Sequence, residues 1–213
     1  MGRIKVRKEI IHQPSTPEVL QCLGSMPVYS KILSENTSDK HYSDFLKWLL
    51  SAIFYNRQEE KITIKKIAAD FKADTTKVTK WINEIYKAIF ELNYEKPELF
   101  QTNGINLSLY MKHFDSSCSF NLSMPAVPRE FEKLNFSFAQ AKVGTSYFWV
   151  KRIDHDIEDN KSGITIWLES GMVNKYREFA LDKSIFHGWI GFMDVYHKSS
   201  FDIDEELKRF NRN

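Results

Sequence analysis

The sequence predicts an α+β protein, with a helical N-terminal domain over residues 1–100 and a β-rich C-terminal domain over residues 101–213. Three observations support this prediction. Apolar residues recur at helical spacing through residues 41–93. From about residue 103 the helical period is replaced by short alternating runs, which are typical of strands. The chain ends in an amphipathic run, residues 201–212, which predicts a closing helix capped near Ser200 or Asp202.

The composition indicates a globular chain with an apolar core. Of its 213 residues, 42% are hydrophobic and 14% aromatic. No run approaches the roughly 20 apolar residues that a membrane span needs, and the N-terminus lacks the apolar stretch of a signal peptide. The isolated Cys22 and Cys118 make neither a disulfide framework nor a zinc site. These features predict a cytoplasmic protein that has no membrane partner.

The first 60 residues predict a strand followed by two helices. Residues 3–12 alternate loosely and are expected to form a strand that ends before Pro14. Thr16 is expected to cap a short helix over 17–23. The polar residues 34–40 predict a loop. Residues 41–57 are apolar around most of a helical circumference, so we expect a central supporting helix there.

Residues 64–93 predict two helices joined by a tight turn. Thr63 is a suitable N-cap for a first helix over 64–71, and Asp74 for a second helix over 75–93. The first helix has its apolar face at Ile64, Ile67, Ala68 and Phe71, and the second at Val78, Trp81, Ile82 and Ile85. The second helix is long, so its C-terminal half is expected to pack on another part of the protein or on a partner.

The spacing of these anchors resembles that of helix-turn-helix DNA-binding proteins over residues 62–82. Such proteins place a small residue inside the first helix, as Ala68 is here, and a branched apolar residue ten positions later, as Val78 is. Another anchor follows at Trp81. The turn usually carries glycine where this chain has Lys72, and lysine adopts a left-handed backbone conformation only at a cost.

The resemblance implies a sequence-specific DNA-binding protein, a transcriptional regulator that contacts the major groove of double-stranded DNA with helix 75–93. The residues expected to face the groove are Thr75, Thr76, Lys77, Thr79 and Lys80, and those expected to contact phosphates are Lys65, Lys66 and Lys72. Charge supports this interpretation. Residues 61–80 carry six lysines and two aspartates, a net charge of +4, whereas the whole chain is only +2.

The C-terminal half predicts a hairpin and further strands. Residues 146–157 and 164–170 alternate on either side of a polar turn at 158–163. Shorter runs at 134–142 and 186–197 are expected to join the same sheet. This half is expected to bind a small effector or a partner, or to form a homodimer.

Two other functions stay open at this stage. The helix pair is also compatible with a protein–protein interaction module in which no DNA is contacted. The acidic cluster at 154–159, which contains Asp154, His155 and Asp156, suggests a metal-dependent nucleic-acid enzyme. No nucleophile motif, paired histidines or phosphate-binding glycine loop is present, so the sequence predicts no catalytic residue, metal or cofactor.

Overall fold

The computed structural model describes residues 9–54, 63–158 and 161–210 and has an α+β fold. The chain divides into two compact units, one ending at Gly171 and the other beginning at Met172. Residues on both sides of position 100, where the sequence pattern predicts a domain boundary, therefore lie in the first unit. The reason is that the helices before residue 100 and the strands after it share one apolar core.

Short helices open the first unit: α1 (Thr16–Ser25), α2 (Pro27–Asn36), α3 (Ser43–Leu49) and a π-helical turn, η1 (Leu50–Phe54). Helix α1 confirms the helix expected at 17–23. Its N-cap is Ser15 and not Thr16, because the Ser15 hydroxyl accepts a hydrogen bond from the backbone N–H of Glu18.

Several boundaries in this region differ from the expectation. Helix α2 begins with Pro27 at its first position and includes residues 34–36, so the expected loop is shorter. The helix expected at 41–57 begins at Ser43 and becomes π-helical at Leu50, and residues 55–57 lie outside the described part of the chain.

The strand expected at 3–12 is not formed by its described residues. Residues 3–8 lie outside the described part of the chain, and residues 9–12 have no strand partner. The backbone N–H groups of Ile10 and His12 donate to the side chains of Asp115 and Ser116 and not to a neighbouring backbone. Hydrogen bonds to side chains do not form the backbone ladder of a β-sheet.

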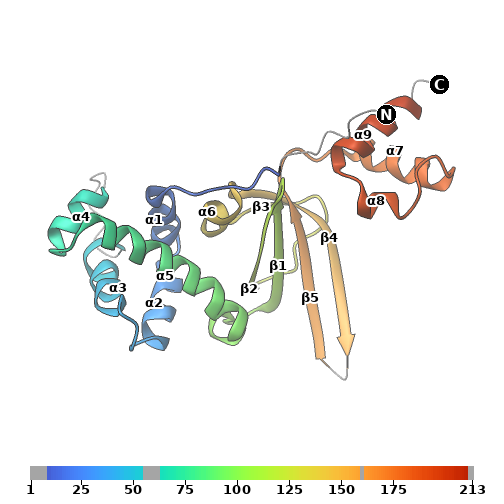
Figure 1. Ribbon diagram of the computed structural model, residues 1–213. Coiled ribbons are helices and arrows are strands. Elements are labelled where there is room, and N and C mark those ends of the chain that lie inside the picture. Colours follow the sequence, from blue (N-terminus) through green and yellow to red (C-terminus); the bar gives the residue numbers. More distant parts are fainter. Residues whose placement is uncertain (1–8, 55–62, 159–160, 211–213) are drawn as a thin grey trace. The chain divides into compact units, whose positions relative to one another are not determined.

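The two predicted helices are present as α4 (Ile64–Asp70) and α5 (Thr75–Glu95), and a 3-10 turn, η2 (Pro97–Phe100), follows them. Helix α5 runs without a break for 21 residues, two beyond the expected end at 93. Figure 1 shows it extending from α4 to the sheet of the same unit. The buried stripe of α5 continues through Ile89 and Leu92, which holds its C-terminal half in the core.

A mixed five-stranded sheet forms the other half of the first unit. Its strands are β1 (Ile105–His113), β2 (Ser116–Met124), β3 (Lys133–Asn135), β4 (Tyr147–Glu158) and β5 (Lys161–Glu169), in the order β2-β1-β5-β4-β3. Only the β1–β5 pairing is parallel. The predicted hairpin is β4–β5. The run at 134–142 adds β3 to the sheet but continues into η3 (Ser137–Ala139) and α6 (Gln140–Val143).

An aromatic core joins α5 and α2 to the sheet. Its rings, which lie with centroids about 5 to 6 Å apart, belong to Tyr29, Phe90, Phe120 and Phe138. The hydroxyl of Tyr86 on α5 donates to the backbone carbonyl of Phe138 over 2.6 Å. Helix α5 is therefore fixed to the sheet by packing and by a buried hydrogen bond.

The second unit is helical: α7 (Lys175–Phe186), α8 (Asp194–His197) and α9 (Ser200–Phe210). The strand expected at 186–197 is wrong, because this stretch is the end of α7, a turn with Gly188 at φ +68° and α8. Helix α9 confirms the closing helix as far as residue 210. In its first turn, the backbone N–H of Asp202 donates a hydrogen bond to the side-chain hydroxyl of Ser199. Across residues 9–54, 63–158 and 161–210, no helix is long and apolar enough to span a bilayer.

Candidate nucleic-acid interface

The first helix of the pair ends in a tight turn built around Lys72. Ile67 and Ala68 are buried, and the Thr63 hydroxyl caps α4 by accepting from the backbone N–H of Lys66 over 3.3 Å. Lys72 has φ +56°, and its N–H donates to the Ala69 carbonyl while the N–H of Ala73 donates to the Ala68 carbonyl. This is the Schellman arrangement that usually has glycine at the left-handed position. Lysine occupies that position here, and the turn keeps its geometry.

Asp74 begins the second helix. Its backbone is extended, and its carboxylate Oδ1 accepts from the backbone N–H of Thr76 over 2.7 Å. This hydrogen bond to the backbone of Thr76 is the main cause that lowers the pKa of Asp74 below its ordinary value. The cap fixes the direction in which α5 leaves the turn, and α5 begins at Thr75, three residues after Lys72.

Four aromatic rings hold the helix pair on α3. Phe45 and Trp48 come from α3, Phe71 ends α4, and Trp81 lies on α5. The ring centroid of Phe45 lies 5.2 Å from the centroids of Phe71 and of Trp81, and the ring centroid of Trp48 lies 5.3 Å from that of Phe71. Val78 is fully buried beside this cluster on the same face of α5. The three helices therefore form one packed support, as a DNA-binding helix pair requires.

The opposite side of the first two turns of α5 faces solvent. We call Thr75, Thr76, Lys77, Thr79 and Lys80 the recognition face. All are exposed except Thr79, which is half-buried. The Lys77 ammonium lies 4.8 Å from the centroid of the Trp81 ring, and the Lys80 ammonium lies 3.8 Å from a Glu84 carboxylate oxygen. Both contacts are at the surface, where exposed ion pairs contribute little and are readily exchanged.

The lysines expected to contact phosphates lie in the part of the chain just before this face. Lys65 and Lys66 are exposed on α4, and Lys72 is exposed in the turn. They lie on the first helix and the turn, while the recognition face lies on the second helix. The eight residues that the sequence singles out thus belong to one continuous segment, residues 63–80, and all but Thr79 are fully exposed.

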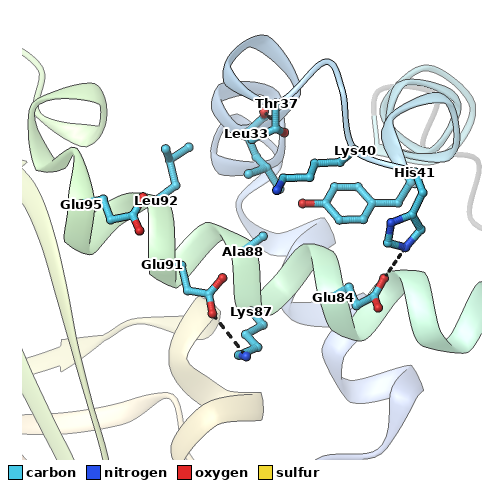
Figure 2. Close-up of a pocket in the computed structure, with 11 residues that line it drawn as sticks. Leu33, Thr37, Lys40, His41, Glu84, Lys87, Ala88, Glu91, Leu92 and Glu95 are labelled. Atoms are coloured by element: carbon cyan, nitrogen blue, oxygen red, sulfur yellow. Dashed lines mark hydrogen bonds and ion pairs between the residues drawn. The ribbon is translucent and has the colours of Figure 1, made fainter.

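The later turns of α5 carry acidic side chains that its first two turns lack. With α2 and the loop that follows it, these later turns line a groove of about 440 Å³ (Figure 2). The His41 imidazole lies 2.8 Å from a Glu84 carboxylate oxygen, and the Lys87 ammonium lies 3.3 Å from that of Glu91. Glu95 and Lys40 also line the groove, so its three carboxylates stand beside two lysines and His41. Contact of helix 75–93 with DNA stays a prediction, and the acidic side chains of this helix lie beyond its first two turns.

Of the acidic cluster at 154–159, Asp154 is engaged in the β4–β5 hairpin, and Asp159 lies outside the described residues. Asp154 accepts hydrogen bonds from the Arg152 guanidinium over 2.8 Å and from the indole N–H of Trp167 over 2.7 Å. His155 and Asp156 are exposed, and as neighbours in a strand they point to opposite faces. Within the part of the chain that the structure describes, no three histidine, cysteine or acidic side chains are grouped closely enough to hold a metal ion.

Comparisons of the chain with models of protein families, with curated proteins and with solved structures find no match in any of the three.

Proposed function

We propose that the protein is a sequence-specific DNA-binding regulator of the cytoplasm, which places the recognition face of α5 in the major groove of double-stranded DNA. The observation that carries this proposal is that the start of α5 is buried on one side and exposed on the other. Val78 and Trp81 are buried on α3 and α4, whereas Thr75, Thr76, Lys77 and Lys80 are exposed on the opposite side. A helix with this arrangement enters a groove while its other side is held by the protein.

The chemistry of the recognition face suits base edges and phosphates. The threonine hydroxyls donate and accept hydrogen bonds, and their methyl groups contact the thymine methyl. Lys77 and Lys80 carry positive charge to base edges or to phosphate oxygens, and Lys65, Lys66 and Lys72 add charge from α4 and the turn. The local net charge of +4 over residues 61–80, on a chain of +2, concentrates the attraction for DNA in this segment.

Lys77→Ala and Lys80→Ala test the proposal, with Lys87→Ala as a matched control. Lys87 lies on the same helix, is equally exposed and pairs with Glu91, but it lies beyond the recognition face. Binding of a fluorescent random-sequence duplex is measured by anisotropy between about 50 and 200 mM salt. We expect each recognition-face variant to weaken binding several-fold and to reduce the slope of log K against log salt by about 1. Lys87→Ala is expected to behave like the unaltered protein.

Sequence specificity is tested by selecting duplexes from a random pool with the unaltered protein. The selected sites are expected to bind at least about 1,000-fold more tightly than random duplex. Thr75→Ala combined with Thr79→Ala should relax the base preference more than it lowers affinity for random duplex. The proposal fails if no duplex is bound, or if Lys77→Ala and Lys80→Ala leave affinity and salt slope unchanged.

A further inference from the structure

Glu84 lines the groove of Figure 2 and also contacts the recognition face, because its two carboxylate oxygens have different partners. Glu84 Oε2 lies 2.8 Å from the imidazole Nε2 of His41, which precedes α3, and Glu84 Oε1 lies 3.8 Å from the ammonium of Lys80. Glu84 is half-buried, whereas His41 and Lys80 are exposed. One carboxylate is thus shared between a histidine and a lysine that is proposed to contact DNA.

The contact with Glu84 opposes the DNA contact proposed for Lys80. A phosphate oxygen that pairs with the Lys80 ammonium must replace the Glu84 carboxylate or lie beside its negative charge, and like charges at short range repel each other. Lys80 precedes Glu84 by four positions, which is the weaker order for a lysine–glutamate pair on a helix, so the carboxylate is readily displaced. We therefore expect Glu84 to lower the affinity for DNA by a modest factor.

The charge of His41 decides how much of this negative charge remains. Between pH 5 and 8, histidine is the ordinary side chain that gains a proton, whereas carboxylates and lysine ammoniums keep their charges. A neutral imidazole 2.8 Å from Glu84 donates a hydrogen bond but leaves the negative charge in place. A protonated imidazole neutralises that charge, so the Lys80 ammonium becomes available to phosphate.

The other groups near His41 do not change the sign of this effect. Charged groups come from its own loop and from α5: Asp39, Lys40, Lys87, Glu91 and Glu95. These residue types ordinarily do not titrate between pH 5 and 8. Burial raises the pKa of Tyr42, whose ring contacts that of His41, above its ordinary value of 10.0, so its phenol stays neutral there. Protonation of His41 therefore adds one positive charge beside the recognition face.

We infer that Glu84 and His41 form a proton-dependent regulator of DNA binding by the recognition face. Glu84 competes with phosphate for Lys80 while His41 is neutral. Protonation of His41 removes this competition, so the affinity for DNA rises as the pH falls. The inference rests on the proposed DNA-binding function and gives a regulatory role to two residues outside the recognition face.

The role of His41 is tested by the anisotropy of a fluorescent random-sequence duplex, measured at fixed ionic strength between about pH 8 and about pH 5.5. We expect the affinity of the unaltered protein to rise about 2- to 5-fold as the pH falls through this range. His41→Gln should remove most of this rise, because glutamine does not gain a proton. His155→Gln, which changes an exposed histidine on β4, should keep it.

The role of the carboxylate is tested by Glu84→Gln. This variant should bind the duplex about 2- to 5-fold more tightly at pH 8 and depend less on pH. Glu91→Gln is the matched control, because Glu91 lies on the same helix and pairs with Lys87 beyond the recognition face, so its affinity should change less. The gain from Glu84→Gln should shrink in a Lys80→Ala background, because the two side chains are in contact.

The outcomes separate this regulator from the function on which it rests. If the unaltered protein binds no duplex at any pH, the DNA-binding function and the regulator both fail. If the duplex is bound but His41→Gln keeps the full pH dependence, or Glu84→Gln binds no more tightly at pH 8, the regulator alone is wrong. Calorimetry of the unaltered protein in two buffers of different ionisation enthalpy needs no variant. DNA binding near about pH 6.5 should take up a fraction of one proton, and absence of uptake would also contradict the regulator.

Discussion

The side-chain amide of Asn93, near the end of α5, binds both backbone polar groups of Asn121 on strand β2. Asn93 Oδ1 accepts from the Asn121 N–H, and Asn93 Nδ2 donates to the Asn121 carbonyl, both over 2.8 Å. Asn93 is 1% exposed. Strand β2 is an edge of the sheet, so its outward backbone groups lack a strand partner, and Asn93 supplies the donor and acceptor that another strand would provide.

Asn93→Ala is expected to lower the free energy of unfolding by about 2 to 4 kcal/mol, because it leaves the backbone groups of Asn121 buried without their partners. Asn83→Ala on the same helix is the control. The Asn83 side chain donates only to an exposed carbonyl of its own helix, so its loss should cost less than about 0.5 kcal/mol. Urea denaturation measures both. Equal losses in the free energy of unfolding would show that the hydrogen bonds between Asn93 and Asn121 stabilise the fold no more than the exposed bond of Asn83 does.

Lys72→Gly is expected to stabilise the protein by about 1 kcal/mol, because glycine adopts φ +56° without steric strain. The same change at Lys65, inside α4, should destabilise it by about 1 kcal/mol. Thermal unfolding distinguishes the two signs. A loss of stability in Lys72→Gly would mean that the lysine side chain stabilises the turn by more than the strain costs.

The cap at Asp74 is expected to make stability depend on acid pH. The folded-state pKa of Asp74 is lowered, so its stabilisation is complete above the ordinary value of 3.8 and is lost as the pH falls through the lower folded-state pKa. Asp74→Ala should therefore lower Tm at pH 7, and the difference from the unaltered protein should shrink below about pH 4. Asp74→Asn keeps a capping oxygen that does not ionise, so its stability relative to Asp74→Ala should stay constant over the same range.

Buried tyrosines are expected to make the protein sensitive to alkali. Burial raises the pKa of Tyr29 to about 12, from an ordinary value of 10.0, and raises that of Tyr86 further. The stability that depends on neutral phenols is complete below pH 10 and is lost as the pH rises above it. Tyr29→Phe should thus become progressively more stable than the unaltered protein above pH 10. Tyr147→Phe, at a 70% exposed position, should show no such trend in urea denaturation.

Local signals explain most of what the sequence predicts correctly. The N-cap residues Thr63 and Asp74, the anchors Val78 and Trp81 and the alternating strands of the hairpin each act within a few residues, so their pattern is visible in the sequence. The turn between the two helices is also local. Its backbone hydrogen bonds hold Lys72 in the left-handed region, where glycine is more usual.

Contacts between distant residues explain what the sequence does not predict. Strands β1 and β5 pair in parallel although more than 40 residues separate them. The alternation of apolar and polar residues along each strand is the same for parallel and antiparallel pairing, so it does not predict the direction. Burial of Asn93 depends on strand β2, which no helical pattern reveals. The groove that the later turns of α5 share with α2 is likewise formed by residues distant in the sequence. Helix α7 was not predicted, because Leu181 is buried while the apolar Tyr176 and Phe179 are exposed, and apolar residues on both sides remove its amphipathic signal.

The continuity of α5 has a mechanical consequence. At 1.5 Å per residue, its 21 residues make a rod about 30 Å long, with the recognition face at one end and the Asn93 contact with the sheet at the other. No proline or glycine interrupts it to act as a hinge. A shift of the sheet edge therefore displaces the recognition face as well, so the geometry at one end of the rod is coupled to the geometry at the other.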